Sequence, residues 1–208
     1  MGNAGKILIF ATFVLLSAWS VYGESPASLV KDGDIIFQTS RSTQSIAIQR
    51  ATDSRYSHMG IIFTRSGSPM VYEAVQTVRY TPLKRWIARG EGGHFVVKRL
   101  TEASNLITRA ALGKLRRQAH MFEGKPYDLT FEWSDERIYC SELVWKIYER
   151  ALGIQVGALQ HLRDFRLDDP AVRKKMKERY GDAVPLNEPV IAPSAMFNAS
   201  NLTIVIQQ

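Results

Sequence analysis

Apolar residues in the first half of the chain gather in four short runs that are rich in Val, Ile, Phe and Tyr. Runs of about four to eight such residues, bounded by Gly, Pro, Ser or Asp, are typical of β-strands. They predict strands over residues 34–39, 57–64, 70–75 and 94–100. Residues 65–69 supply the Gly, Ser and Pro expected where a chain reverses, so the second and third strands are predicted to form a hairpin.

A helical period replaces these runs in the second half, where apolar residues recur every three to five positions. Two shorter helical stretches also lie within the strand-rich half. Together the patterns predict helices over residues 42–51, 82–89, 101–122, 141–152, 169–180 and 193–199. Strands followed by helices favour an α+β fold class in which the helices pack on a mainly antiparallel sheet.

The first 23 residues have the pattern of a secretory signal peptide. Lys6 precedes the apolar residues 7–19, and small residues follow up to Gly23. This apolar stretch is shorter than the roughly 20 residues that span a bilayer as a helix. We therefore expect the segment to be cleaved, leaving residues 24–208 as a single domain with no stable membrane anchor, in the periplasm or secreted from the cell.

Charge narrows the possible partners. The chain carries 27 Lys and Arg against 20 Asp and Glu, a formal net charge of +7 at pH 7, which attracts anionic surfaces. Genomic nucleic acid is not the resident polyanion outside the cytoplasm. The basic run 173–179 also lacks the interleaved aromatic residues that stack on bases. We therefore expect no nucleic-acid partner, and cell-wall carboxylates or anionic lipid headgroups as neighbours.

The supply of metal ligands is poor. Cys140 is the only cysteine, which excludes an internal disulfide and any zinc site built from two or more thiolates. The acids between residues 128 and 136 show neither the spacing of a calcium loop nor a helical histidine pair, and we expect them to be solvated loop residues. The sequence therefore predicts no metal and no cofactor.

Cys140 directly precedes the predicted helix 141–152. At a helix N-terminus a thiolate is stabilised by the positive end of the macrodipole, and free backbone N–H groups can hold an oxyanion. Position alone leaves a second interpretation equally open, in which Cys140 is a small apolar residue on the inner face of the helix.

A nucleophilic cysteine needs an imidazole base, and that imidazole needs an acceptor for its other nitrogen. His58 shares one face of its strand with Gly60, which we expect to leave open space beside the ring. Glu73 lies across the predicted hairpin, where it could accept the second N–H of His58. The alternatives are a structural His58 in the core and a Glu73 that faces solvent on an edge strand.

Several segments resemble the YiiX/YebB-like family of permuted papain-fold cysteine hydrolases. The matching segments are residues 33–37, 56–60, 71–74, 124–128 and 139–144. The resemblance implies a circularly permuted papain-like (NlpC-type) fold over residues 24–208. It also implies a chain order of histidine, acid and cysteine, in place of the cysteine-first order of papain.

Transferred to this sequence, the resemblance implies Cys140 as nucleophile, His58 as general base and acid, and Glu73 as the residue that orients His58. Relatives include enzymes acting on peptidoglycan stem peptides and lipid acyltransferases. The first hypothesis is therefore an exported cysteine amidase or peptidase, whose substrate is a small peptide, an amino-acid-like compound or a cell-wall fragment. The alternatives are a lipid-directed thioesterase or acyltransferase of the same mechanism, and a non-catalytic module that binds amino acids or cell wall.

Two further residues are candidates for substrate binding. Arg41 follows the first strand, and Tyr139 directly precedes the candidate nucleophile. Both could line the cleft, and a structural role is the alternative for each.

Overall fold

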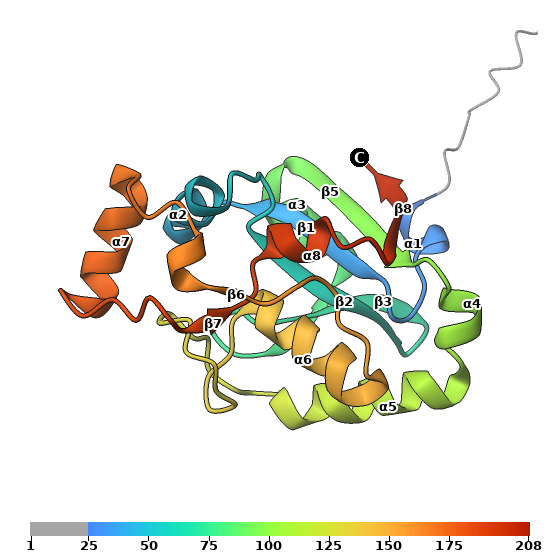
Figure 1. Ribbon diagram of the computed structural model, residues 1–208. Coiled ribbons are helices and arrows are strands. Elements are labelled where there is room, and N and C mark those ends of the chain that lie inside the picture. Colours follow the sequence, from blue (N-terminus) through green and yellow to red (C-terminus); the bar gives the residue numbers. More distant parts are fainter. Residues whose placement is uncertain (1–24) are drawn as a thin grey trace, which may run out of the picture.

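The computed structural model describes residues 25–208 (Figure 1). The predicted signal peptide and its cleavage site lie outside these residues. Within the described part of the chain, no helix is both long and apolar enough to cross a membrane.

The centre of the molecule is a six-stranded sheet with the strand order β4-β3-β2-β1-β5-β8, and every neighbouring pair is antiparallel. Its strands are β1 (Ile35–Ser40), β2 (His58–Arg65), β3 (Ser68–Glu73), β4 (Arg79–Pro82), β5 (Gly90–Leu100) and β8 (Leu202–Gln207). The predicted hairpin is confirmed, because Arg65 pairs with Ser68 across a two-residue turn. A separate two-stranded ribbon joins β6 (Gln160–His161) and β7 (Pro189–Val190).

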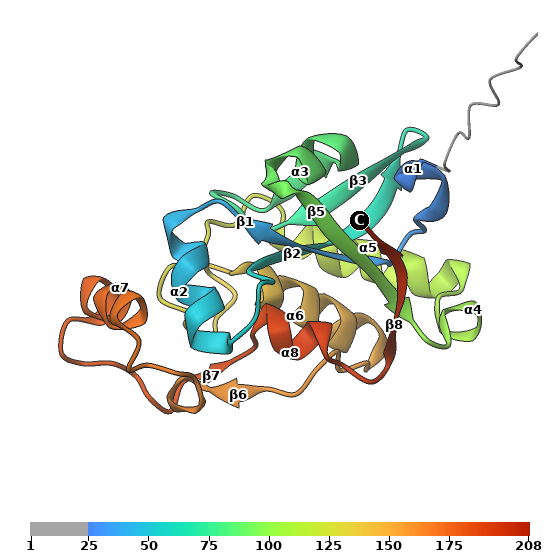
Figure 2. The same ribbon diagram turned by 90° about the horizontal axis from the view of Figure 1, so that it is seen from above.

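The helices cover both faces of this sheet (Figure 2). They are α1 (Pro26–Leu29), α2 (Thr43–Thr52), α3 (Leu83–Arg89), α4 (Ala103–Leu106), α5 (Arg109–Phe122), α6 (Cys140–Leu152), α7 (Pro170–Tyr180) and α8 (Pro193–Phe197), with a 3-10 turn η1 (Leu162–Asp164). Helix α3 lies on one face, and α5, α6 and α8 lie on the other. The arrangement confirms the predicted α+β class with a mainly antiparallel sheet.

The two faces of the sheet have separate apolar cores, as strand alternation requires. The larger core joins odd-numbered residues of β1 and β2, such as Phe37 and Met59, to α5 and α6. The smaller core joins the even-numbered Ile36 and Ile62 to Trp86 of α3. His58 and Glu73 belong to the same face as this smaller core, as the alternation along β2 and β3 indicates.

One predicted helix needs correction, and two strands of the central sheet were not predicted. The prediction of a single helix over residues 101–122 is wrong, because the helix is interrupted before Thr108. The Thr108 side chain accepts a hydrogen bond from the Ala111 N–H and caps α5. Strands β4 and β8 were not predicted. Both are edge strands. Strand β4 has only four residues and ends at Pro82, so it is too short to show an apolar alternation. Strand β8 has the apolar residues Leu202, Ile204 and Ile206 at alternate positions, a strand signal that the prediction overlooked.

Candidate active site

The nucleophile predicted from the sequence is the first residue of α6. Cys140 is 2% exposed, and its side chain acts on the first residue of β2, where it raises the pKa of His58. The first turn of a helix carries N–H groups that have no partner within the helix. The sulfur thus lies beside unsatisfied donors and beside an imidazole, which is the environment that a cysteine nucleophile requires.

His58 is held on its other side by Glu73. The His58 Nε2 and Glu73 Oε2 atoms are 2.6 Å apart, and the Glu73 side chain is fully buried. This contact leaves Nδ1 as the ring nitrogen for Cys140. The structure thus brings His58 and Glu73 into direct contact and places Cys140 where it acts on the His58 ring, although the three residues lie far apart in the sequence.

Gly60 makes the contact between β2 and β3 possible by allowing the two strands to approach closely, and it does not leave open space beside the imidazole as predicted. Ile61 pairs with Tyr72, so Gly60 lies opposite Glu73 when the register is extended by one residue. A Cβ atom at Gly60 would lie 2.6 Å from both the Tyr72 carbonyl oxygen and Val71 Cγ1. The expected space beside the imidazole is therefore filled by β3. The missing side chain instead lets β3 approach closely and sets Glu73 diagonally across from His58.

The interpretation of Glu73 as a solvent-facing glutamate on an edge strand is wrong. Strand β4 pairs with the outer side of β3, so β3 is an inner strand, and Glu73 is fully buried. Four side chains donate to or pair with the Glu73 carboxylate: those of His58, Thr81, Trp86 and Arg89. Burial by itself would raise the pKa of this carboxyl. The hydrogen bond and charge of His58, together with Thr81 and Arg89, outweigh burial and lower the pKa of Glu73 to about 2.

His58 titrates in the opposite direction. Its burial disfavours the charged ring, but the hydrogen bonds to Cys140 and Glu73 favour it more strongly and raise the pKa of His58 to about 9. The indole of Trp86 lies nearly parallel to the ring, with centroids 5.9 Å apart, and covers it from the α3 side. The site thus stabilises an imidazolium in a place that is largely closed to water.

The start of α6 is anchored on both sides of Cys140. Tyr139 is 2% exposed, and its hydroxyl accepts a hydrogen bond from the Ile191 N–H. The Ser141 hydroxyl donates to the Ile191 carbonyl. These two bonds fix the backbone around the sulfur against residues 189–192. Tyr139 therefore has a structural contact as well as a place beside the cavity described below.

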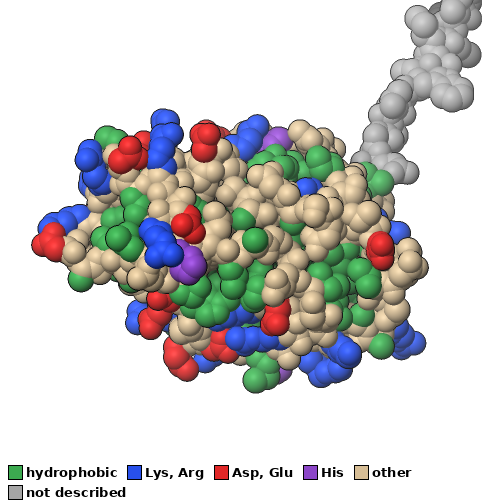
Figure 3. Space-filling model, viewed as in Figure 1, with side chains coloured by type: hydrophobic (Ala, Val, Ile, Leu, Met, Phe, Trp, Pro, Cys, Tyr) green, Lys and Arg blue, Asp and Glu red, His purple; other side chains and the backbone are tan. Residues whose placement is uncertain are grey.

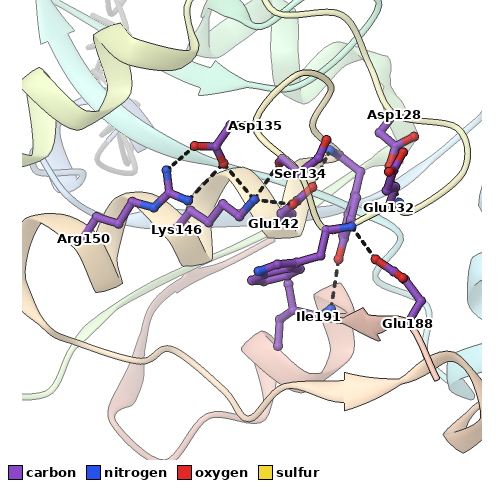
Figure 4. A network of polar contacts seen from close by, with 11 residues as sticks. Asp128, Glu132, Ser134, Asp135, Glu142, Lys146, Arg150, Glu188 and Ile191 are labelled. Atoms are coloured by element: carbon purple, nitrogen blue, oxygen red, sulfur yellow. Dashed lines mark hydrogen bonds and ion pairs between the residues drawn. The ribbon is translucent and has the colours of Figure 1, made fainter.

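A partly buried polar network holds the loop that leads into α6 (Figure 4). Lys146 Nζ contacts Glu142 Oε1 at 2.7 Å and Asp135 Oδ1 at 3.0 Å, and Arg150 also binds Asp135. Burial raises the pKa of Glu142 to about 8 against the opposing effect of Lys146. The backbone N–H of Tyr139 donates to Glu142, so the network reaches the residue next to the sulfur.

The expectation that the acids of this loop are solvated is wrong for Asp128. Its side chain is 1% exposed and accepts hydrogen bonds from the N–H groups of Thr130 and Glu132. A carboxylate at this position therefore closes a turn in the loop, which satisfies buried backbone donors that solvent does not reach.

Two hollows meet at the candidate site. One, the apolar cavity, lies between α2, the start of α6, α7 and residues 189–193, and Cys140 lines it. The other, the polar basin, is lined by residues that include His58, Arg41 and Arg89. Ile48 and Tyr127 line both hollows. The structure thus places Arg41 on the wall of the polar basin and Tyr139 on the wall of the apolar cavity.

Sequence reasoning missed the residues that surround the triad. Thr81, Trp86 and Arg89 lie on β4 and α3, and they meet Glu73 only because β4 pairs with β3. Tyr127 was quoted only as part of a motif, yet its hydroxyl accepts a hydrogen bond from Gln44 at the boundary of the two hollows. The one available signal was the motif around residues 124–128, which gave no role for the tyrosine.

Comparison with known proteins identifies the family of the chain. Residues 29–206 match the model of a family described as permuted papain-like amidase enzymes, YaeF/YiiX, of the C92 family. The chain belongs to this family. It shares 51% identity with the YiiX protein of Escherichia coli (strain K12) over an alignment of 176 residues. This alignment covers 85% of the present chain and 86% of that protein. The papain-like, permuted fold predicted from the sequence is thereby confirmed.

A solved structure is equally similar. The crystal structure of the metalloprotein YiiX from Escherichia coli O157:H7 superposes with a TM-score of 0.83 and 50% identity, over 86% of this chain and 98% of that chain. Residues 25–208 of the present chain contain no group of three or more His, Cys, Asp or Glu side chains arranged to hold a metal ion. The donor set of these residues therefore does not fit a metal site.

Proposed function

We propose that the protein is an exported cysteine amidase that works through Cys140, His58 and Glu73. The observation that carries the proposal is the chain of contacts from the thiol to the imidazole and from the imidazole to a buried, fully bonded carboxylate. Membership of a family of permuted papain-like amidases supports the same reaction class. The carboxylate fixes the ring, and the ring exchanges a proton with the sulfur.

In the first step, the Cys140 thiolate attacks the carbonyl carbon of the amide, and His58 carries the thiol proton as an imidazolium. The new oxyanion is held by the Cys140 N–H at the start of α6. Tyr127 is the second donor. Gln44 donates to its oxygen, and burial and the neighbouring Cys140 raise the pKa of Tyr127 well above its ordinary value, so the hydroxyl keeps a proton to donate.

Collapse of this intermediate breaks the carbon–nitrogen bond. The leaving nitrogen takes the proton of His58 and departs as an amine, which leaves a thioester on Cys140. In the second step, His58 takes a proton from water, the resulting hydroxide attacks the thioester, and the carbon–sulfur bond breaks. A carboxylic acid is released, and the thiolate–imidazolium pair is restored.

The proposal extends to location and to substrate. The signal-peptide pattern of residues 1–23 and the net charge of +7 favour a protein in the periplasm or outside the cell, close to cell-wall carboxylates or lipid headgroups. A peptide or cell-wall fragment is one candidate substrate class.

The single cysteine makes the test direct. Intact mass spectrometry after treatment with iodoacetamide reports Cys140 alone, because the chain has no other thiol. We expect wild-type protein to gain one adduct rapidly and to hydrolyse acyl anilides, and Cys140→Ala to do neither while keeping its circular dichroism spectrum. Cys140→Ser controls for the loss of thiol volume.

His58→Ala should slow the labelling of Cys140 by more than tenfold at pH 7, because the thiolate loses its imidazolium partner. Hydrolysis that survives in Cys140→Ala, or labelling that is indifferent to His58, would refute the proposed mechanism. The latter result would favour the alternative in which the fold binds its ligand without catalysis.

A further inference from the structure

The polar basin is the side of the site on which the leaving amine departs, an assignment that rests on the proposed function. The leaving nitrogen must lie within hydrogen-bond reach of His58, which gives it a proton. His58 lines the polar basin, whereas Cys140 lines the apolar cavity. The basin offers about 1210 Å³, counting the open solvent at its mouth. The amine part of the substrate therefore extends from the scissile bond into the basin.

We propose that the polar basin is an anion subsite, and that the amine released by the enzyme carries a carboxylate or a phosphate close to its nitrogen. Two guanidinium groups, those of Arg41 and Arg89, line the basin. Among the described residues that line it there is no Asp or Glu. An anion that enters the basin therefore meets positive charge without a competing carboxylate on the wall.

Arg89 has hydrogen-bond donors beyond those that Glu73 uses. Its Nη2 atom lies 2.7 Å from both Glu73 carboxylate oxygens, and its side chain is 39% exposed. A guanidinium carries five N–H groups in a planar fork, and the contact with Glu73 engages only the Nη2 end. The other N–H groups can therefore bind an anion in the basin while Glu73 keeps its place beside His58.

Arg41 lies on a short loop between β1 and α2 whose backbone is held in place. The Ser40 hydroxyl accepts a hydrogen bond from the Ser42 N–H, and the Ser40 N–H donates to the Ser57 hydroxyl. The Arg41 side chain is exposed and forms no ion pair with any residue that the structure describes. The loop thus presents an uncompensated positive charge at the wall of the basin.

Two neutral features of the basin also fit an amine with an anion nearby. The start of α2 borders the basin, since Ser42 and Gln44 line it, and the first N–H groups of a helix favour anions. Gln38 lines the basin directly across from His58 in the β1–β2 register. Gln38 is 1% exposed, and its Oε1 atom has no hydrogen-bond partner among the described residues. The N–H of the bound amine would supply the partner that this buried amide lacks.

The overall charge of the molecule does not account for such a site. In Figure 3, Lys and Arg side chains are scattered over the visible face among acidic ones and form no single patch there. Salt screens exposed charges that are more than about 8 Å apart at physiological ionic strength. Selection of a substrate by charge therefore depends on the few groups that line the basin, and one arginine can be tested on its own.

Binding without turnover tests the anion subsite independently of catalysis. Isothermal titration of Cys140→Ala compares benzamides that differ only in the amine part: N-benzoylglycine, N-benzoylglycinamide, N-benzoyl-O-phosphoethanolamine and N-benzoyl-1,2-diaminoethane. We expect the carboxylate and the phosphate to bind roughly tenfold more tightly than the neutral glycinamide, and the cationic compound to bind most weakly. The affinities of the first and third compounds show which anion the basin prefers. The preference for anions should decrease as the salt concentration rises.

Charge reversal at one residue locates the effect. In the Cys140→Ala background, we expect Arg41→Glu to abolish the preference for anions and to bind the cationic benzamide more tightly than N-benzoylglycine. Arg50→Glu makes the same change in net charge at an exposed residue in the last turn of α2, which lines a different hollow. It should keep the preference for anions. Arg41→Gln, which only removes the charge, should weaken the preference and serves if Arg41→Glu fails to fold.

The outcomes separate the anion subsite from the amidase. Equal affinity for anionic and neutral benzamides, or a preference for anions that survives Arg41→Glu, would overturn the subsite whatever the wild-type enzyme hydrolyses. A preference that depends on Arg41, in a protein whose Cys140 is neither labelled nor catalytic, would keep the subsite and refute the amidase. The same preference together with a higher wild-type kcat/KM for N-benzoylglycine than for N-benzoylglycinamide supports both.

Discussion

Glu73 shows how strongly the ionisation of one buried side chain depends on residues that are distant in the sequence. Its position across the hairpin from His58 was predictable from the strand pattern. The three other side chains that bind the carboxylate come from β4 and α3, and no local pattern indicated them. Together with His58, these side chains keep the Glu73 carboxylate ionised although it is buried away from water. Solvent therefore does not screen the interaction between its charge and His58.

Replacing this carboxylate should affect the reaction more than the fold. In Glu73→Gln the imidazolium loses its buried counter-charge, so the pKa of His58 falls from about 9 and the alkaline limb of the kcat/KM profile moves to lower pH. We expect kcat to fall by roughly 10- to 100-fold, with little change in KM. Steady-state kinetics between pH 5 and 10 measure both effects.

Glu91 provides the control for this variant, because it is an exposed carboxylate on β5. Glu91→Gln should leave the pH profile unchanged. A Glu73→Gln profile that merely drops in height, with both limbs in place, would show that Glu73 stabilises the fold and does not tune His58.

At the scale of elements, the hairpin β2–β3 positions the proposed base His58 and its partner Glu73, and α6 positions the proposed nucleophile Cys140. The pattern of apolar residues predicted all three elements, because each is an inner strand or a helix with one apolar face. It failed at β4, β8 and the break between α4 and α5. Strand β4 depends on pairing at a sheet edge, and the break between the helices depends on a single capping hydroxyl; an apolar pattern records neither. Strand β8 does have alternating apolar residues, and the prediction overlooked them.

Gly60 gives an element-scale prediction. An added methyl at this position collides with the backbone of β3, so Gly60→Ala should lower the free energy of unfolding by roughly 1–3 kcal/mol. By moving β3 away from β2, it should also reduce kcat more than tenfold at temperatures where the variant is fully folded. Denaturant titration and kinetics on the same sample separate the two losses.

The matched control is Gly113 in the middle of α5. A methyl there meets only the flexible end of Arg117 at 3.5 Å, so Gly113→Ala should stabilise the protein by roughly 0.4–1 kcal/mol without changing kcat. Full activity in folded Gly60→Ala would contradict the role of strand spacing in catalysis.

At the scale of the whole molecule, the site contributes to the pH dependence of stability. The pKa of Glu73 is about 2 in the folded protein and 4.5 in its ordinary state. Because the folded value is lower, the contribution of Glu73 is complete above about pH 4.5 and is lost as the pH falls toward 2. Its full size is about 3 kcal/mol, of which about 2 kcal/mol is lost by pH 3.

Guanidinium titrations of wild type and Glu73→Gln at pH 6 and pH 3 test this linkage. The wild type should lose about 2 kcal/mol more than the variant between the two pH values. Equal losses in both proteins would mean that the folded environment does not hold this carboxyl in its ionised form.

The termini of the described chain lie close together at one side of the molecule. Helix α1, which begins at Pro26, packs against β8, whose last residue is Gln207, and Arg99 of β5 donates to the Leu29 carbonyl (Figure 1). A short linker could therefore join them, and new ends could be cut in the surface loop before Tyr139 without moving any group of the triad. A protein permuted in this way would begin with its cysteine helix, the cysteine-first order of papain, and would keep the same three-dimensional arrangement of Cys140, His58 and Glu73.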